Sequence, residues 1–577
     1  MARSNEAVEA ALLEYAELLS ITGSDPYKPR SYEKAARSIG GYHADVATLD
    51  AKGILEIPNV GRSIGEKVGE LLESGRIEAL EELRERIPDG VRQMMAVPGL
   101  GPKKANVLYR ELGIASVEQL LDAVEDDRLA GLKGFGPKTA DNIRRGVAQM
   151  SDSGGRVLLS LALDVAEELL GELRELPQVL RADYAGSLRR MAETIGDVDL
   201  LVASVDAGPI MERFVSLPRV DRVIAKGPTK SSVVTNAGLQ VDLRVIEPPV
   251  WGAAMIYFTG SKAHNVRIRE MAVRKGLKLS EYGLFRAESG ELIAAETEEV
   301  VYRHLGLPFI PPTLREDRGE VEAALAGELP DVVTLKQIKG DLHTHTNLTD
   351  GLASLEEMVA TASTLGYAYY AVTDHAPNLY MQRMTDEKML AQRDRVRALQ
   401  ARYPKMTLLH GTELNIDPDG GVDWPPAFLE GFDLCVASVH SHFNQSKDEM
   451  TRRIVRAMDN PYVHVIGHPT ARMIGKRQPI EFDLEEVFAA AARTGTALEV
   501  NGFPDRLDLR DEHISWARRH GVRFAVDTDS HAVGHLSHMR FGVAMAQRGW
   551  VAKDDVINAW PLARLKRFLH SNASTGA

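Results

Sequence analysis

From residue 336 to the C-terminus, short apolar runs alternate with longer amphipathic stretches. The runs have the length and apolar character of buried parallel strands, and the stretches between them have the pattern of helices. This alternation predicts an α/β barrel, in which chemistry collects at the C-terminal ends of the strands. The predicted strands end in polar residues of the types that bind metals. They span residues 339–345, 369–375, 407–414, 435–442, 463–469, 496–502 and 522–531.

The preceding part of the chain has a different pattern. Over residues 151–246 one long helix, at about 156–173, is followed by four apolar strands, which predicts an α+β domain. Residues 247–315 form a second, smaller α/β segment. The stretch 316–335 combines prolines with charges and lacks a strand pattern, so we expect a linker there. The barrel then occupies residues 336–577.

Residues 1–150 contain short helices separated by glycine and proline, and one pattern occurs three times. Each copy has an apolar residue, a glycine turn and then a helical, often basic run. Such a turn leaves backbone N–H groups free at a helix start, where they can hold a phosphate oxygen. The alternative is a glycine turn that serves only to pack two helices. The copies are "IPNVGRSIGEKVGELL" (57–72), "VPGLGPKKANVLYREL" (97–112) and "LKGFGPKTADNIRRGV" (132–147).

The repeated pattern resembles the helix-hairpin-helix, a motif that grips the DNA backbone without reading its sequence. We expect one copy in a lyase-like domain at residues 1–88 and two copies in a fingers domain at residues 89–150. Lysines beside the turns favour DNA contact over simple packing. The residues that would contact DNA are Gly61, Lys67, Gly99, Gly101, Lys103, Lys104, Gly134, Gly136 and Lys138.

Composition narrows the class of protein. At 577 residues the chain is too long for one core, and 44% hydrophobic residues are ordinary for a globular protein. No apolar run approaches the roughly 18 residues that cross a bilayer, and acidic residues interrupt the N-terminal stretch where a signal peptide would be apolar. The single cysteine, Cys435, excludes an intramolecular disulfide and fits a reducing compartment. We therefore expect a cytoplasmic protein with no membrane segment.

Charge and histidine content change this picture in one respect. The net charge of −13 argues against binding nucleic acid by bulk attraction, although local basic patches can still bind it. Of 17 histidines, 14 follow residue 340. This excess indicates that the predicted barrel uses imidazole for a specific chemistry.

Two carboxylates interrupt a predicted strand in "IGDVDLLV". Asp197 and Asp199 lie two residues apart, so both side chains point to the same face of an extended chain. They repel each other unless a cation lies between them, and a third aspartate, Asp242, interrupts the apolar strand "VDLRVI". Three carboxylates on neighbouring strands can hold two Mg²⁺ or Mn²⁺ ions. The alternative is that they only form salt bridges with nearby arginines.

Three segments carry a resemblance to a known family. "GSLRRMAETIGDVDLLV", "VDLRVI" and "WGAAMIYFTGSKAHNVRIREMAVRKGLKLSEYGLF" resemble, in this order, the palm and thumb of X-family DNA polymerases. The resemblance implies a nucleotidyltransferase in which Asp197, Asp199 and Asp242 are the catalytic metal ligands. It also implies that Arg269 contacts template DNA. The residues that would bind the incoming dNTP are Ser187, Arg190, Gly196, Tyr257, Phe258, Thr259, Gly260 and Asn265.

The chain departs from the family pattern at several positions. Lys262 stands where relatives have an aspartate against the nucleotide base, and Met191 replaces a small residue beside the triphosphate site. Lys67 matches the lysine that forms a Schiff base in relatives that remove deoxyribose phosphate. Ser63, however, stands at a second position that is basic in those relatives. Lyase activity and simple phosphate binding by Lys67 are therefore both open.

The barrel has its own motif, "GDLHTHTNLTDG", which places two histidines on one face of a strand end and an aspartate in the following turn. Neutral imidazole together with carboxylate suits Zn²⁺, Mn²⁺ or Fe²⁺. From residue 336 to the C-terminus, the motifs resemble the PHP (polymerase and histidinol phosphatase) phosphoesterase domain, a distorted (β/α)7 barrel. The resemblance implies a cluster of three metals. Its ligands would be His343, His345, Asp350, His375, Glu413, His440, His468, Asp529 and His531.

The PHP resemblance also assigns the ligands to individual metals, with Glu413 bridging two of them. Asp350 stands where many relatives have histidine, which favours Mn²⁺. His442 and His464 match no ligand motif, so we expect them to be rim or packing residues. The three sets would be His343, His345 and Asp529 with Glu413, then His440 and His468 with Glu413, and finally Asp350, His375 and His531.

Together these expectations describe a multidomain, bacterial-type family X DNA polymerase. It would have all-α helix-hairpin-helix domains, an α+β palm with a small thumb, and a C-terminal PHP barrel. We expect a monomer that fills short gaps in DNA repair, with gapped or primer–template DNA and dNTPs as partners. The PHP domain would be a 3′–5′ exonuclease, and abasic-site endonuclease or phosphatase action fits the same metals. Two alternatives are a phosphoesterase whose polymerase half only binds DNA, and a non-catalytic scaffold for DNA ends.

Overall fold

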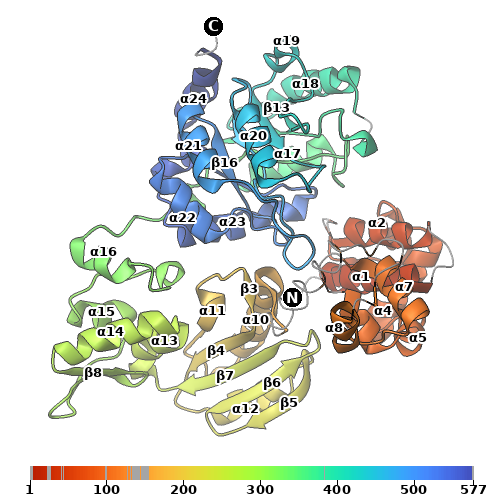
Figure 1. Cartoon of the computed structure of the whole chain (residues 1–577). Helices are drawn as coiled ribbons and strands as arrows, with labels where there is room; N and C mark the ends of the chain where they lie inside the picture. The colour runs from red at the N-terminus through yellow and green to blue at the C-terminus, as the bar shows by residue number, and fades with distance from the viewer. Residues whose placement is uncertain are drawn as a thin grey trace. The chain divides into compact units, whose positions relative to one another are not determined.

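The computed structural model describes most of the 577-residue chain, which divides into two compact units (Figure 1). One unit contains residues 1–152, 334–543 and 553–577, and the other contains residues 153–333 and 544–552. None of the helices in the described part of the chain combines the length and apolar character that a bilayer span requires. The described residues are 4–22, 27–40, 44–95, 100–126, 155–382 and 384–574, with the single residues 42, 97, 128, 129, 132, 135, 139 and 143.

Short helices with apolar faces form the N-terminal segment of the first unit. Leu12, Val68 and Leu108, from three different helices, are fully buried in one hydrophobic core. The first helix packs against the second, fifth and seventh, so that residues distant in sequence share this core. The helices are α1 (Ser4–Thr22), α2 (Lys28–Gly40), α3 (Ala51–Glu56), α4 (Arg62–Ser74), α5 (Glu78–Arg86), α6 (Asp89–Met95), α7 (Gly101–Leu112) and α8 (Val117–Glu125).

Two of the three predicted glycine turns lie at helix starts within the described residues. In the first, the Val60 N–H donates to the Ile57 carbonyl at 3.1 Å, and Gly61 is the N-cap of α4. In the second, the Leu100 N–H donates to the Val97 carbonyl at 3.0 Å before α7 begins. The pairs α3–α4 and α6–α7 are therefore helical hairpins, as the sequence pattern predicts. Most of the third copy lies outside the described residues.

A five-stranded sheet in the order β2-β4-β7-β6-β5 is the centre of the second unit. β4 and β7 run parallel, and their register pairs Asp199 with Asp242. α10 and α12 pack against this sheet, and Val198 and Leu200 of β4 are fully buried, which confirms the predicted α+β pattern. The elements are β1 (Val157–Leu158), α10 (Leu159–Arg174), β2 (Arg181–Tyr184), α11 (Gly186–Arg189), β3 (Thr194–Ile195), β4 (Asp197–Ala203), α12 (Gly208–Val215), β5 (Val220–Lys226), β6 (Lys230–Thr235) and β7 (Gln240–Ile246).

A smaller segment of helices and a three-stranded antiparallel sheet, β10-β9-β8, follows β7. Ile256 and Ile268 belong to its core. The stretch 316–335, for which the sequence predicts a linker, contains a helix whose Val321 and Ala324 pack into the same core, since a spacing of three places both on one helix face. The elements are α13 (Trp251–Thr259), α14 (Lys262–Arg274), β8 (Leu277–Ser280), β9 (Gly283–Arg286), β10 (Leu292–Ala294), α15 (Glu298–His304) and α16 (Glu320–Ala326).

Seven parallel strands form a barrel in the sequential order β11 to β17. A backbone bridge between Thr344 and Ser530, just beyond the ends of β11 and β17, nearly closes the sheet into a barrel. Each strand overlaps one of the seven predicted runs, which confirms the (β/α)7 prediction. The strands are β11 (Gly340–Asp341), β12 (Tyr369–Val372), β13 (Thr407–Asn415), β14 (Leu434–Ser438), β15 (Val465–Ile466), β16 (Ala497–Asn501) and β17 (Phe524–Asp527).

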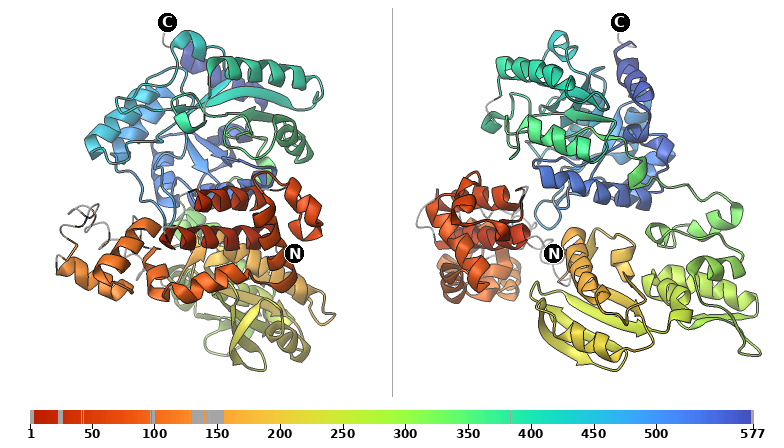
Figure 2. Two further views of the ribbon diagram at one scale, coloured as in Figure 1. Left: turned by 90° about the vertical axis from the view of Figure 1, so that its right-hand side faces the viewer. Right: turned by 180° about the vertical axis from the view of Figure 1, so that it is seen from behind.

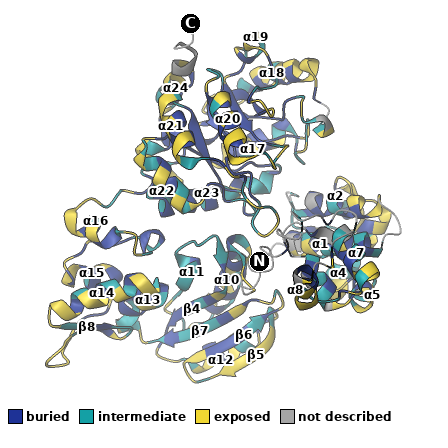
Figure 3. Ribbon diagram, in the orientation of Figure 1, coloured by how far each residue is buried: buried dark blue, intermediate teal, exposed yellow. Residues whose placement is uncertain are grey.

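Helices surround the strands of the barrel (Figure 2), and the strands are largely buried, whereas these helices carry exposed residues (Figure 3). Leu409, Val436 and Ala525, from three strands, fill part of the apolar core. This arrangement explains why the strands appear in the sequence as continuous apolar runs. The larger helices are α17 (Leu355–Thr364), α18 (Asp386–Gln400), α20 (Lys447–Met458), α21 (Leu484–Thr494), α22 (Asp511–Arg519), α23 (Met539–Arg548) and α24 (Leu562–Ser574), with the short α19 (Pro426–Leu429).

His464 joins the barrel to α24. Its Nδ1 accepts the Cys435 N–H at 3.0 Å, and its Nε2 donates to the Leu569 carbonyl at 2.9 Å. The neutral ring therefore uses both nitrogens, and burial lowers the pKa of His464 to about 4. This residue has a packing role, in agreement with its lack of a ligand motif.

We expect His464 to make the fold less stable as pH falls. Unfolded chains bind a proton near the ordinary histidine pKa of 6.5, whereas folded His464 resists protonation down to about pH 4. The loss of stability over this window is on the order of 3 kcal/mol. His464→Gln cannot titrate, so the stability advantage of wild type in urea unfolding should shrink from neutral pH to about pH 4.5. An advantage that stays constant with pH would contradict this assignment.

Candidate functional site

The nine predicted PHP ligands meet at the C-terminal ends of the barrel strands. His343 and His345 follow β11, Asp529 and His531 follow β17, and Glu413 lies near the end of β13. Parallel strands of a barrel end at the same edge, so residues nearly 190 positions apart come into contact there. Three more histidines follow β12, β14 and β15, namely His375, His440 and His468, and Asp350 lies in the loop after β11.

Glu413 lies at the centre of these histidines and is buried. Its Oε1 is 3.0 Å from His468 Nε2 and 3.1 Å from His440 Nε2. Its Oε2 is 2.9 Å from His375 Nδ1 and 3.5 Å from His343 Nε2. Because the two oxygens face different sets of imidazoles, this carboxylate has the geometry of a bridge between two metal positions.

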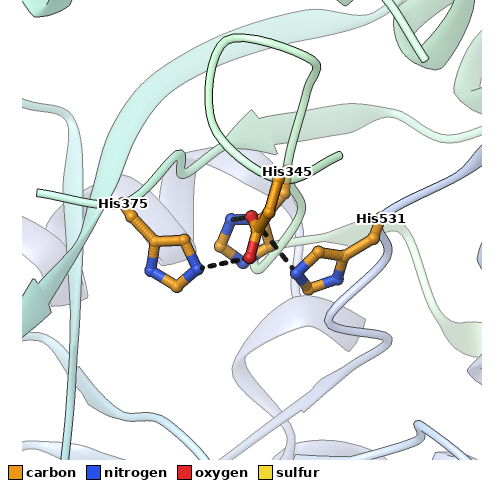
Figure 4. Close-up of side chains that lie close together, drawn as sticks. His345, His375 and His531 are labelled. Atoms are coloured by element: carbon orange, nitrogen blue, oxygen red, sulfur yellow. Dashed lines mark ion pairs between the residues drawn. The ribbon is translucent and has the colours of Figure 1, made fainter. Parts of the chain in front are cut away.

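Two aspartates organise the remaining imidazoles. The Asp350 carboxylate lies 3.3 Å from His375 Nε2 and 3.4 Å from His531 Nε2, and Figure 4 shows the rings of His345, His375 and His531 gathered around these ion pairs. Asp529 Oδ1 lies 3.3 Å from His345 Nε2. Three groups have ligand atoms within 4.8 Å of one another: His345, Asp350, His375 and His531; His343, His345 and Asp529; and His375, Glu413 and His440.

Burial and neighbouring charges shift the titration of these groups. Burial disfavours the charged ring of His375, but Glu413 and Asp350 outweigh it and raise its pKa to about 10. Burial dominates at His440 and lowers its pKa to about 4. Burial also opposes ionisation of Glu413, yet the nearby histidines hold its pKa well below the ordinary value. The Glu413 carboxylate is therefore ionised, as a metal ligand must be.

Several buried ring nitrogens in the cluster make no hydrogen bond to the described residues, although carboxylates lie near some of them. His343 Nε2, both ring nitrogens of His345 and His468 Nδ1 have no hydrogen bond within the described residues. Buried polar atoms are normally satisfied, so their accumulation at one point indicates a missing ligand. Imidazole nitrogens and carboxylate oxygens are the donors that divalent transition metals take in proteins. The residues present therefore fit the metal cofactor that the PHP resemblance implies.

Glu499 of β16 contacts the cluster, and the sequence prediction missed it. It is fully buried, and its Oε1 accepts from His343 Nδ1 at 2.7 Å. Its Oε2 accepts from the His468 backbone N–H and from Asn501 Nδ2. A proton fixed on His343 Nδ1 leaves Nε2 with the lone pair, and Nε2 is the nitrogen that faces Glu413. The sequence feature that could have identified Glu499 is its position as an acidic residue inside the apolar run "TALEVNG".

We expect Glu499→Gln to weaken metal binding by about 10–100-fold, because a neutral amide no longer fixes the proton of His343 on Nδ1. Metal content after dialysis, measured by plasma mass spectrometry, reports this loss without an activity assay. Glu430→Gln, at an exposed position after α19, is the matched control. Equal metal retention by the two variants would show that Glu499 does not support the cluster.

In the palm, Asp199 and Asp242 lie side by side on the parallel strands β4 and β7, and Asp197 shares their face. Burial and repulsion from Asp197 and Asp242 raise the pKa of Asp199 to about 6. Burial acts in the same sense on Asp242, but Lys230, 2.8 Å away, helps to bring its pKa below the ordinary value. Among the described residues, the palm carboxylates do not converge as closely as the barrel ligands. Their arrangement concentrates negative charge and fits divalent cations.

The short helix α11 brings the predicted triphosphate turn next to these aspartates. Gly186 has a φ of 61°, and a Cβ there would lie 2.8 Å from Asp199 Oδ2. Ser187 follows it directly. Gly196 precedes the first aspartate, and a Cβ at that position would lie 3.1 Å from an Arg156 nitrogen. Glycine at position 186 lets the backbone approach Asp199 closely, and glycine at position 196 leaves room for the Arg156 side chain.

The two arginines of "GSLRRM" have different partners. Arg189 forms an ion pair at 2.6 Å with Glu298, at the start of α15, and so joins the palm to the thumb. Arg190 Nε lies 3.0 Å from Glu316, and its Nη1 donates to the Thr259 carbonyl at 2.7 Å. Arg190, the arginine predicted to bind the triphosphate, is thus held between α11 and the end of α13.

Three predicted nucleotide and template contacts line one small depression, namely Tyr257, Asn265 and Arg269. Asn265 Nδ2 donates to the Tyr257 carbonyl at 2.7 Å, whereas its Oδ1 is buried and has no hydrogen bond within the described residues. Tyr257 lies on α13, and the other predicted contacts, Phe258, Thr259 and Gly260, lie at the end of that helix.

The predicted DNA contacts of the N-terminal segment are described only in part. Lys67, on α4, has its Nζ 5.7 Å from the centroid of the Tyr15 ring, and Ser63 lies 3.4 Å from the Tyr32 hydroxyl. A lysine beside aromatic rings is compatible with both phosphate binding and Schiff-base chemistry. Gly61, Gly101, Lys103 and Lys104 lie at the starts of α4 and α7, while Gly99, Gly134, Gly136 and Lys138 lie outside the described residues.

Models of known families match four segments of the chain. A helix-hairpin-helix domain matches residues 3–77, and a SAM-like helix-hairpin-helix tandem matches residues 91–148. The DNA polymerase beta thumb matches residues 254–316, and the PHP domain matches residues 341–502. The segments, the palm sheet and the barrel cluster together define a family X DNA polymerase with a PHP domain.

Individual relatives agree with these matches. The chain is 35% identical over 557 residues to the DNA polymerase/3′-5′ exonuclease PolX of Bacillus subtilis (strain 168), which covers 96% of this chain and 97% of the relative. The chain belongs to the PolX family. It is 26% identical over 323 residues to DNA polymerase lambda of Rattus norvegicus, covering 53% of that protein. It is 28% identical over 242 residues to a probable phosphatase of Thermoanaerobacter sp. (strain X514), covering 93% of that protein.

Proposed function

We propose that this chain extends the 3′ end of DNA at its palm and removes nucleotides from a 3′ end at its barrel. The observation that carries the proposal is the presence of two separate acidic sites on one chain, the Asp199–Asp242 strand pair and the Glu413 cluster. Membership of the PolX family supports it, since the Bacillus subtilis relative is named for both activities. The substrates would be dNTPs and gapped or primer–template DNA, and the protein would act as a cytoplasmic monomer in DNA repair.

At the palm, the primer 3′-hydroxyl attacks the α-phosphate of the dNTP, and pyrophosphate leaves. Asp197, Asp199 and Asp242 would hold two Mg²⁺ or Mn²⁺ ions, which lower the pKa of the hydroxyl and stabilise the charge on the phosphates. The pKa of Asp199, about 6, shows that gathering these charges is unfavourable without a cation. Each aspartate would therefore contribute most when nucleotide and cation are both present.

The surrounding residues would bind and orient the nucleotide. Ser187 and Gly196 flank the aspartates and would accept the triphosphate, with Arg190 as its cationic partner. The α13 segment 257–260 would border the sugar. Asn265 would use its unpaired Oδ1 toward the nucleotide base or minor groove, and Arg269, which lines the same depression, would contact the template.

At the barrel, water attacks the terminal phosphodiester, the bond to the 3′ oxygen of the preceding nucleotide breaks, and a deoxynucleoside monophosphate leaves. Three Mn²⁺, Zn²⁺ or Fe²⁺ ions would activate the water and neutralise the phosphate. Glu413 would bridge two of them, and Asp350 would belong to the third set, which favours Mn²⁺. The same centre would fit hydrolysis at an abasic site. The glycine turns before α4 and α7 would hold the DNA backbone through their N–H groups.

A second candidate function is a metal-dependent phosphoesterase whose polymerase half only binds DNA. The similarity to a probable phosphatase along the barrel favours it. The palm argues against it, because a DNA-binding scaffold has no need of Asp199 and Asp242 paired in register within otherwise apolar strands. We therefore assign polymerase activity to the chain.

Two substitutions separate the two activities. Asp242→Ala should abolish primer extension on a gapped duplex while 3′ degradation continues, because it removes one palm ligand and leaves the barrel intact. His343→Ala should abolish 3′ degradation while extension continues. Gel analysis of one 5′-labelled primer with Mg²⁺ or Mn²⁺, with and without dNTPs, measures both.

Wild type and Asp221→Ala, an exposed aspartate on β5, serve as controls for these assays. If both activities persist in both variants, the assignment of the two sites is wrong. If wild type degrades 3′ ends but never extends a primer, the phosphoesterase function replaces the polymerase function.

A further inference from the structure

Three side chains that have no part in the metal cluster lie on consecutive loops at its edge. Phe443 follows β14, Arg477 follows β15 and Arg506 follows β16, and these strands are neighbours in the barrel. The same loops carry the ligands His440 and His468. The two arginines and the phenylalanine are neither fully buried nor fully exposed. Because they lie beside the cluster, these three side chains are candidates for contacts with a bound substrate.

Arg506 is directly linked to the cluster. Its Nε lies 3.4 Å from Asp529 Oδ2, the oxygen that also accepts from Asn501 Nδ2 at 3.2 Å. The other oxygen of Asp529 faces His345. Arg506 Nη1 is buried and has no hydrogen-bond partner within the described residues. One end of this guanidinium therefore orients a ligand, and the other end has an unused donor.

Arg477 carries a charge that its own contacts do not neutralise. Its Nε donates to the Ala471 carbonyl at 2.6 Å, and its guanidinium lies 4.4 Å from the centroid of the Phe443 ring. Both of these partners are uncharged. Burial and the nearby charge of Arg506 lower the pKa of Arg477 to about 10, although the Asp508 carboxylate acts in the opposite sense. Asp508 offsets the repulsion between the two arginines only in part, so a further anion beside them would be favourable.

Arg472, a neighbouring arginine in these loops, has contacts that stabilise the fold. Arg472 is buried and donates to the carbonyls of Arg506 and Leu507, and Asp508 lies close enough to affect its charge balance. It holds the two loops together. Arg477 differs because it bonds a single loop carbonyl, that of Ala471, and places the rest of its guanidinium over the Phe443 ring, so packing alone does not explain its position.

We propose that Phe443, Arg477 and Arg506 form the subsite that binds the last nucleotides of a single-stranded DNA 3′ end. Arg506 would donate its unused Nη1 to the phosphate that is cleaved, and Arg477 would contact the next phosphate. Phe443 would stack on a base, which needs no particular sequence because every base has a flat face. The inference rests on the proposed exonuclease function and adds to it the residues that select a DNA strand over a small phosphate ester.

The test compares DNA with a substrate too small to reach the subsite. Full-length Arg477→Ala and Phe443→Ala should each lower kcat/KM for a 5′-labelled single-stranded oligonucleotide, relative to bis-p-nitrophenyl phosphate, by about tenfold, mainly through KM. With Arg477→Ala, the slope of log KM against log salt should also fall by about 0.7, the value for one phosphate contact on a single strand. Arg395→Ala, on the exposed face of α18, is the matched control.

The outcomes separate the subsite from the function on which it rests. An unchanged substrate ratio and salt slope in Arg477→Ala and Phe443→Ala would overturn the subsite. An equal loss on both substrates would also overturn it, because the residues would then act on the metal cluster. If an alanine variant misfolds, Arg477→Gln and Phe443→Leu take its place. Wild type that cleaves the small ester but not DNA would instead overturn the exonuclease function itself.

Discussion

Both sites of this chain depend on the cost of placing like charges close together inside a fold. Carboxylates that share a partly buried site repel each other, and burial raises the cost further. The palm gathers Asp197, Asp199 and Asp242 with Lys230 as a close cation, and the pKa of Asp199, about 6, is the measure of that strain. The barrel reduces the repulsion between its carboxylates in a different way. Its carboxylates are interleaved with imidazoles, so Glu413, Asp350 and Asp529 all have pKa values below their ordinary range.

This difference indicates how each site would bind its metal ions. The barrel ligands already converge, because a nearly closed sheet fixes seven strand ends around one point and Glu499 sets the proton on His343. The palm sits on an open five-stranded sheet and has fewer cationic partners, so its carboxylates gain most from cation and triphosphate together. Under the proposed function, hydrolysis would use a preformed centre, whereas synthesis would use one that the substrate completes. The two chemistries on one chain would then have different requirements for metal before DNA binds.

The sequence predicted which side chains converge in the barrel, but it did not predict the residues around them. His343, His345 and the other barrel ligands follow apolar strands, where a local pattern suffices to find them, and the spacing of Asp197 and Asp199 indicates their shared face. Glu499 and Arg506 depend on contacts between strands far apart in sequence, so no local spacing marks them. The same limit applies to α16, because only two of its apolar residues, Val321 and Ala324, are buried, which is too few for a local pattern to mark a buried helix face. It also applies to Arg189, which bonds to Glu298 of the thumb and differs from Arg190 only in its tertiary partners.

The central claim is that one chain holds two separate metal sites with different donor sets. Anomalous diffraction from crystals of the full chain soaked in Mn²⁺, with a dNTP and a primer–template, tests it most directly. The account predicts anomalous peaks beside Asp199 and Asp242 and a second group of peaks around Glu413. Peaks at only one of these positions, or peaks displaced from both, would contradict it.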